Sequence, residues 1–300
     1  MLIKKDKEVL LGYSKIQHGS FNDRIYVMDY KHALDPYLIS KLDVMVKNYS
    51  YGKIIAKVPK EARLNFLRNG FDEEAIIPEF YNGRKPCYFM ARYHNKERKI
   101  IVKKNSIDTI IHKAKNNKKS DLISMDDKYY LTLLNEEDSV RISNIYKQVF
   151  KTYPFPIHDE KYIKKTMDED VLYFGAMDNE KLIGVSSCDM NVHEENVEMT
   201  DFAILPEYRG NKLARHLLKM MEDTMGKSGL KIAYTIARSA SYPMNATFSA
   251  AGYKYGGTLW NNTQIAGSIE SMNIWYKPLN NKKGIENDEE SSYSVVVSEK

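Results

Sequence analysis

The chain has 300 residues, enough for one large domain or two of ordinary size. Its 43% of apolar and 28% of charged residues are typical of a globular protein with a buried core. Two cysteines, Cys87 and Cys188, exclude a disulfide framework, and no apolar run reaches the roughly 20 residues of a membrane-spanning helix. The N-terminus lacks the apolar stretch of a signal peptide, so we expect a soluble cytoplasmic protein with no membrane partner.

The net charge of +5 is unevenly distributed. Residues 1–128 hold 26 Lys and Arg against 16 Asp and Glu, whereas residues 129–300 hold 19 against 24. A basic half can indicate nucleic-acid binding, but its densest part, 96–119, lacks interleaved aromatic residues and any DNA-binding motif. We interpret it as a solvated connection and expect no nucleic-acid partner.

The front of the chain alternates strand and helix patterns, which indicates a small α/β domain over residues 1–93. A basic linker is expected over 94–128 and a polar, disordered tail over 280–300. The expected front elements are strands at 14–17 and 24–30, a helix opened by Asp35-Pro36, a strand at 53–58, a helix at 60–69 ended by Gly70, and strands at 74–78 and 86–93.

Residues 129–279 have a more regular pattern, with antiparallel hairpins followed by parallel pairing. This mixture predicts an α/β or α+β layer with a mixed central sheet. The expected elements are a strand at 130–134, a helix capped by Asn135 and reaching Phe150, a helix at 159–167, strands at 171–177, 182–189 and 197–205, a helix at 211–225, a strand at 231–237, a helix at 243–251 and two final strands.

The segment after Pro206 has the features of an anion-binding site. A strand ends there, a basic turn follows, and a helix begins at once. The first turn of that helix leaves backbone N–H groups without helical partners and carries the positive end of the helix dipole. Arg209-Gly210-Asn211 therefore forms a possible cradle for a phosphate or pyrophosphate, although any α/β protein contains ordinary turns of this kind.

Pro206-x-Tyr-Arg-Gly-x-x-Leu-Ala-x-x-Leu-Leu resembles motif A of the GNAT acetyltransferases, and the element order over 129–279 resembles the whole GNAT fold. The resemblance implies an acetyl-CoA-dependent N-acyltransferase, without a metal, whose turn amides hold the pyrophosphate. Lys212 stands where the family pattern has its middle glycine, so its backbone must adopt a conformation that a Cβ allows. The resemblance implies that the pantetheine arm pairs with the strand Phe202, Ala203 and Ile204, with Ile204 nearest the thioester oxygen, and that the cradle comprises Arg209, Gly210, Asn211, Lys212, Leu213 and Ala214.

A second match lies in Asn245-Ala-Thr-Phe-Ser-Ala-Ala-Gly-Tyr. In the family this asparagine contacts the pantetheine, and a tyrosine protonates the departing thiolate. Phe248 occupies that tyrosine position here, but a thiol with a pKa near 8.5 can leave without a dedicated acid. The substitute donors are Tyr253, which we name as candidate, and its alternatives Tyr242 and Tyr255.

An alkyl ammonium group with a pKa of about 10.4 must lose a proton before it attacks a thioester. Glu198, six residues before Ile204, lies where several GNAT enzymes keep their base, and we favour it in this role. In a regular strand Glu198 would share a face with Thr200, Phe202 and Ile204, with Asp201 opposite. A bulge would reverse this, so Asp201 remains the second candidate.

The ends of the chain resemble the β-lysine N6-acetyltransferases, in 15–26 and 77–83 and in the segment from Leu259 to Trp275. That resemblance covers about residues 13–279 and implies β-lysine as acceptor, with a lysine 2,3-aminomutase as pathway neighbour. A carboxylate and a second amine on the substrate need a cation and oxygen acceptors. The candidate substrate residues are Arg24, with Arg238 as alternative for the carboxylate, and Asn262, Glu270 and Asn273, beside Asn261 and Gln264.

The sequence leaves three hypotheses about the function open: acetylation of β-lysine; acetylation of another amine, such as lysine, a polyamine or a protein lysine; and a non-catalytic acyl-CoA sensor. The stretch 53–93 echoes the second half of a GNAT fold, but no Arg-Gly turn precedes its helix. We expect this degenerate GNAT half to complete the substrate pocket rather than bind a second cofactor. Formation of a homodimer is the alternative role.

Overall fold

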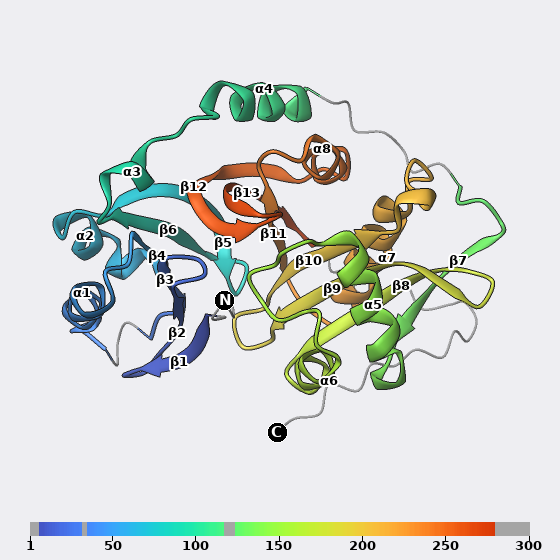
Figure 1. Cartoon of the computed structure of the whole chain (residues 1–300), viewed down its shortest axis with the longest axis horizontal. Coiled ribbons are helices and arrows are strands. Elements are labelled where there is room, and N and C mark those ends of the chain that lie inside the picture. Colours follow the sequence, from blue (N-terminus) through green and yellow to red (C-terminus); the bar gives the residue numbers. More distant parts are fainter. Residues whose placement is uncertain (1–5, 32–34, 117–123, 280–300) are drawn as a thin grey trace.

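The computed structural model describes residues 6–31, 35–116 and 124–279, so the predicted tail lies outside the described residues. One mixed sheet of 13 strands runs through this part of the chain, in the order β1-β2-β3-β4-β6-β5-β12-β13-β11-β10-β9-β8-β7 (Figure 1). The fold class predicted from the sequence, a mixed α/β protein with a large mixed sheet, is confirmed. None of the described helices is long and apolar enough to cross a lipid bilayer.

The front half contributes six strands and two helices, which occupy the blue end of the molecule in Figure 1. The first strand and the edge it forms were not predicted, since its sequence is only five residues long and shows no alternation of apolar and polar residues. The elements are β1 (Lys7–Leu11), β2 (Ser14–Gly19), β3 (Arg24–Asp29), α1 (Leu38–Tyr49), β4 (Lys53–Pro59), α2 (Lys60–Arg68), β5 (Asp72–Tyr81) and β6 (Lys85–Tyr93).

The rear half supplies the other seven strands and lies at the opposite end of the view (Figure 1). Its elements are β7 (Tyr129–Leu134), the 3₁₀ turn Glu136–Asp138, α5 (Ser139–Val149), α6 (Glu160–Asp168), β8 (Val171–Asp178), β9 (Lys181–Asn191), β10 (Asn196–Ile204), the 3₁₀ turn Pro206–Tyr208, α7 (Leu213–Lys227), β11 (Ile232–Arg238), α8 (Tyr242–Ala250), β12 (Lys254–Ile265) and β13 (Ser268–Pro278).

The two halves repeat one topology in opposite directions along the sheet. Read toward the join between the halves, the front half has the order β3-β4-β6-β5, and the rear half has the equivalent order β10-β11-β13-β12. Each half has a parallel pair, β3/β4 or β10/β11, at the corresponding position. The halves join where Gly257 pairs with Ala75. A Cβ on Gly257 would lie 2.3 Å from the Glu74 carbonyl oxygen, so only glycine permits this close approach.

Helices cover both faces of the rear sheet. One apolar cluster joins α7 and α8 to the strands, and another joins α5 and α6 to the opposite face. In the front half, α1 and α2 cover one face, whereas the other face packs on residues of β11, β12 and β13. This last contact curls the sheet, so that β2, β3 and β4 face β8, β9 and β10 across a common cavity.

The basic range 94–128 contains two helices, α3 (Lys96–Lys99) and α4 (Lys104–Lys115). Ile107, Ile111 and Ala114 of α4 are buried, and the Ser249 hydroxyl of α8 donates a hydrogen bond of 2.6 Å to the Ala114 carbonyl. These helices were not predicted, because the range contains few apolar residues. Burial of three small or β-branched residues is nevertheless enough to dock α4 on α8.

Candidate active site

Strands β10 and β11 separate like the arms of a V. They pair in parallel only at Asn196–Glu198 and Ile232–Tyr234, although β10 continues to Ile204 and β11 to Arg238. Glu198 and Tyr234 are the last partners before the strands diverge. The backbone edges beyond this fork face one another without pairing, which provides the N–H and C=O groups that an extended ligand can use.

A β-bulge in β10 reverses the expected alternation of side chains. Thr200 pairs with Ser187 but Ala203 pairs with Val185, and Asp201 between them has a φ of +56°. Asp201 therefore joins Glu198 and Thr200 on the cavity face. The regular-strand prediction, which placed Phe202 and Ile204 with Glu198, is wrong: both pack in the cluster beneath α7, whereas Ala203 lies on the α5 face.

The start of α7 has the form that a diphosphate requires. The helix begins at Leu213, two residues later than predicted, and the preceding turn puts Gly210 at φ +90° with no atom within 4 Å of an added Cβ. Lys212 holds a left-handed conformation, φ +55°, which costs a non-glycine residue roughly 1–2 kcal/mol. Arg209 and Lys212 flank this turn, and the first N–H groups of a helix lack intrahelical partners, so these residues fit the diphosphate of acetyl-CoA.

A cavity of about 400 Å³ opens beside the fork. Its wall combines the front strands β2, β3 and β4 with β8, β9, β10 and α6, so neither half forms it alone. The cavity lining includes Arg24, Tyr26, Lys57, Tyr153, Asp189, Glu198, Asp201 and Asn262. In the described part of the chain, no three His, Cys, Asp or Glu side chains are arranged to hold a metal ion.

Glu198 stands in this wall at the fork of the V. The pKa of its carboxyl group is raised to about 7, chiefly by burial and also by nearby Asp189 and Asp201, against the opposing effects of Lys57 and Tyr234. A carboxylate with this pKa is ionised in part at neutral pH and is a strong enough base to take a proton from a bound ammonium group.

Asp201 has a different environment. Its carboxylate accepts hydrogen bonds from the Tyr153 hydroxyl, from the Ser187 hydroxyl at 2.7 Å and from the Thr200 hydroxyl at 3.3 Å. Burial raises the pKa of Asp201, and the three hydroxyl groups oppose this change. Three donors fix the orientation of the carboxylate and occupy most of its acceptor sites, which suits electrostatic recognition better than proton transfer.

Arg24 is a buried cation without a carboxylate partner among the described residues. It is 3% exposed, and its guanidinium donates to the Asn262 carbonyl at 3.0 Å, to the Thr263 hydroxyl at 2.5 Å and to the Gln17 side chain at 3.1 Å. Burial lowers its pKa to about 10. Two polar atoms in this corner, Arg24 Nε and Asn262 Oδ1, are buried without a hydrogen-bond partner. A ligand carboxylate and ammonium group would satisfy both.

Three buried cations hold the segment of β12 that carries Asn262. Lys53 Nζ donates to the Trp260 carbonyl at 2.7 Å, Arg98 Nε to the Asn261 carbonyl at 2.8 Å, and Arg24 to the Asn262 carbonyl. This segment is bulged, with Asn261 at φ +42°. Three consecutive carbonyl groups of this bulge are thus each bound by a cation from the front half or from α3. These contacts fix the part of the cavity wall that β12 contributes.

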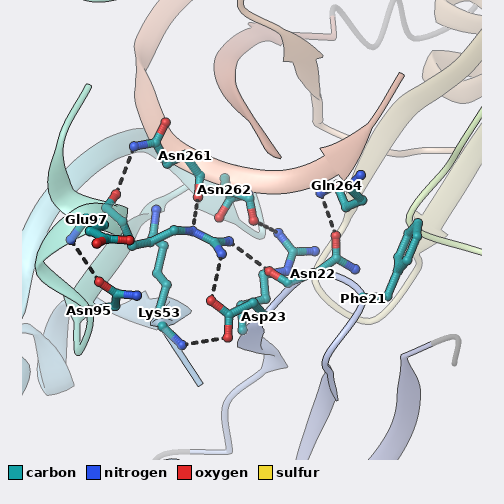
Figure 2. A network of polar contacts seen from close by, with 12 residues as sticks. Phe21, Asn22, Asp23, Lys53, Asn95, Glu97, Asn261, Asn262 and Gln264 are labelled. Atoms are coloured by element: carbon teal, nitrogen blue, oxygen red, sulfur yellow. Dashed lines mark hydrogen bonds and ion pairs between the residues drawn. The ribbon is translucent and has the colours of Figure 1, made fainter. Parts of the chain in front are cut away.

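Figure 2 shows how the turn at Asn22 and Asp23 lies against the same bulge. The Asn22 side chain accepts a hydrogen bond of 2.7 Å from the Gln264 N–H, and Arg98 pairs with Asp23 at 3.1 Å. The segment from Leu259 to Trp275, which the sequence analysis singled out, is therefore the contact between the halves as well as part of the cavity.

The structure does not bring Asn245 and Asn273 to the cavity. Asn245 is fully buried: its amide donates to the Arg238 and Ser241 carbonyls, and its Oδ1 accepts from Asn273 at 2.8 Å and from Trp275 at 2.8 Å. The Oδ1 of Asn273 accepts from Thr258. Both asparagines therefore help to fasten α8 to the sheet; Asn245 uses all four of its hydrogen-bonding capacities there, and Asn273 is fully buried away from the cavity lining.

Three further predicted residues also lie elsewhere. Glu270 makes a two-point ion pair with Arg238 at 2.9 and 2.8 Å, and neither residue lines the cavity. Phe248 is fully buried between Phe202 and Tyr253 in the cluster below α7. Tyr253 does not line the cavity, and its hydroxyl faces Glu222 instead. The predicted replacement of the missing tyrosine by Tyr253 therefore lacks structural support.

Sequence analysis missed Lys57, Tyr26, Tyr153 and Asp189, all of which line the cavity. One signal was present for Lys57: it is a charged residue within the apolar strand Lys-Ile-Ile-Ala-Lys-Val-Pro. Tyr153 lies in an irregular loop, for which no periodic pattern exists.

Comparisons with known proteins agree with this geometry. The acetyltransferase (GNAT) family model matches residues 140–253. A β-lysine N(6)-acetyltransferase of Methanococcus maripaludis is 39% identical over 272 residues, which cover 91% of this chain and 98% of that protein. N-acetyltransferase YodP of Bacillus subtilis is 32% identical over 267 residues, covering 88% and 95%.

Among solved structures, the ribosomal-protein-S18-alanine N-acetyltransferase of Escherichia coli superposes with a TM-score of 0.46 at 18% identity, covering 53% of this chain and 99% of that one. The predicted resemblance to the β-lysine acetyltransferases is confirmed by the full-length relatives. The chain belongs to the GNAT family of acetyltransferases and is an acetyl-CoA-dependent N-acyltransferase that transfers an acetyl group to an amine.

Proposed function

We propose that the enzyme acetylates the N6 amine of β-lysine, forming N6-acetyl-β-lysine. The observation that carries this proposal is the buried Arg24, a cation without an acidic partner among the described residues, in a cavity that also contains Glu198. A substrate with a carboxylate at one end and a reacting amine at the other satisfies both groups. The similarity to curated β-lysine N(6)-acetyltransferases supports the same acceptor.

In the proposed mechanism, Arg24 binds the substrate carboxylate, and the unpartnered Asn262 Oδ1 accepts a hydrogen bond from the adjacent ammonium group. Asp201 and Asp189 add negative charge that attracts a dicationic ligand. Glu198 takes a proton from the N6 ammonium group, directly or through water, and thereby frees its lone pair. The new C–N bond forms as the C–S bond breaks, the electron pair leaves with the thiolate, and the nitrogen gives up its remaining surplus proton to the thiolate or to water.

The first turn of α7 binds the diphosphate of acetyl-CoA through its N–H groups, with Arg209 and Lys212 adding positive charge. The unpaired edges of the V accept the pantetheine arm, which directs the acetyl group to the fork where Glu198 lies. The thiolate leaves without a side-chain acid, because a thiol pKa near 8.5 makes it a good leaving group.

The proposed acceptor, β-lysine, must be supplied by a reaction that moves the α-amino group of lysine to the β position.

Thiol release measured with acetyl-CoA and a series of amines tests the proposal. We expect β-lysine to have a higher kcat/KM than lysine, a polyamine or a protein lysine. The matched comparison is a diamine of the same spacing that lacks the carboxylate. Arg24→Gln should lower kcat/KM for β-lysine about 10- to 100-fold, the loss expected for one charge-assisted contact, and leave the diamine almost unaffected. Equal losses for both would reject a carboxylate site at Arg24.

A further inference from the structure

The front half places a cation opposite the proposed base. Lys57 extends from β4 into the cavity that Glu198 enters from β10. The charged and titratable groups around Glu198 come from several elements: Lys57 of β4, Tyr26 of β3, Tyr153 of the loop before α6, Asp189 of β9, Asp201 of β10 and Tyr234 of β11. Lys57 is the only cation in this set of described residues.

Aromatic rings keep the Lys57 ammonium group in position. Its Nζ lies 5.8 Å from the ring centre of Tyr26, 5.9 Å from that of Phe80 and 5.8 Å from that of Tyr234. These distances are within the range of cation–π attraction. Phe80 of the front half and Tyr234 of the rear half also contact each other, with centres 5.1 Å apart. The cage is therefore built across the contact between the halves.

Tyr234 connects the cage to the fork. Its hydroxyl accepts a hydrogen bond of 3.5 Å from Lys57 Nζ, and Tyr234 is the register partner of Glu198. Side chains of register partners project from the same face of a sheet, so Tyr234 lies beside Glu198 and also contacts Lys57. The ammonium group has no carboxylate within 4.0 Å among the described residues, and its charge acts across the cavity.

We propose that Lys57 is a positioning residue through which the front half keeps Glu198 ionised at neutral pH. The proposal rests on the proposed role of Glu198 as base. Lys57 neither receives the proton nor binds the acetyl group; its positive charge stabilises the carboxylate form against two neighbouring acidic groups. Burial would lower the pKa of Lys57, but Tyr26 and Glu198 raise it, so the lysine remains charged throughout the working range.

The test is the dependence of kcat/KM for β-lysine on pH in Lys57→Met, Lys57→Gln and Lys57→Arg. Because an opposite charge nearby lowers the pKa of a carboxyl group by about 1–3 units, loss of Lys57 should move the acid limb upward by about one unit or more. Activity should fall at neutral pH and recover at high pH. Lys57→Arg should keep the limb near its original position.

Lys165→Met is the matched control, because Lys165 lines the same cavity but pairs with Glu169 at 3.4 Å on the exposed rim. Its acid limb should not move. Thermal melting and binding of coenzyme A establish that each variant is folded, and Lys57→Gln replaces Lys57→Met where the latter fails this check.

Two results separate this proposal from the one on which it depends. If the acid limb of kcat/KM does not move in Lys57→Met and Lys57→Gln, and KM for β-lysine rises equally at all pH values, Lys57 is a substrate ligand and the inference is overturned. Retention of the limb in Glu198→Gln would instead refute the role of Glu198, whatever Lys57 does.

Discussion

The clearest contrast in the structure is between two asparagines, Asn245 and Asn262. Asn245→Ala removes a side chain that is 0% exposed and makes four hydrogen bonds, whereas Asn262→Ala removes one that is 3% exposed with an unpartnered Oδ1. The first change leaves the buried N–H groups of Asn273 and Trp275 without an acceptor. Each orphaned donor costs about 1–3 kcal/mol, so the free energy of unfolding should fall by about 2–6 kcal/mol.

Urea unfolding followed by fluorescence or circular dichroism measures this difference, with thiol-release kinetics on the same samples. Asn245→Ala should shift the midpoint strongly, with little change in KM for acetyl-CoA in the protein that remains folded. Asn262→Ala should leave the free energy of unfolding within about 0.5 kcal/mol of the parent, as expected for a side chain without structural hydrogen bonds, and raise KM for the amine. The reverse pattern, with stable Asn245→Ala and a raised KM for acetyl-CoA, would refute our assignment of Asn245 to structure.

Three further outcomes follow from the site. The acid limb of kcat/KM should have a midpoint near pH 7, because Glu198 has a pKa of about 7 and acts as base only when deprotonated. Glu198→Gln should remove this limb, and a limb that persists in this variant would contradict the mechanism. Arg209→Ala should raise KM for acetyl-CoA more at low salt than at high salt, whereas an unchanged KM would put the diphosphate elsewhere. Lys212→Gly should increase the free energy of unfolding by roughly 1 kcal/mol in urea unfolding, by relieving the left-handed backbone, and a loss of stability would show that the lysine side chain matters more than its φ.

The elements that depend on local pattern were predictable. The strand before Pro206, the turn at Gly210 and the apolar stripe of α7 each have a local signature, and together they predict where acetyl-CoA binds. The bulge at Asp201 was foreseen only as an alternative, because a one-residue change of register depends on pairing with β9 rather than on residue type.

The residues of the substrate cavity could not be assigned in the same way. Asn245, Asn262 and Asn273 are the same residue type in similar polar contexts, and only tertiary contacts distinguish the two that fasten α8 from the one that faces the cavity. Glu270 lies in the same polar segment, and its pairing with Arg238 depends on the register of β11 and β13, which the sequence does not reveal. Lys57 lies more than a hundred residues from Glu198 in sequence, and the curl of the sheet brings them into one cavity.

A crystal structure with coenzyme A and β-lysine tests the central claim most directly. Our account predicts the diphosphate on the N–H groups at the start of α7, the thiol at the fork of β10 and β11, the N6 amine beside Glu198 and the substrate carboxylate on Arg24. A β-lysine carboxylate away from Arg24, or an amine facing a group other than Glu198, would contradict it.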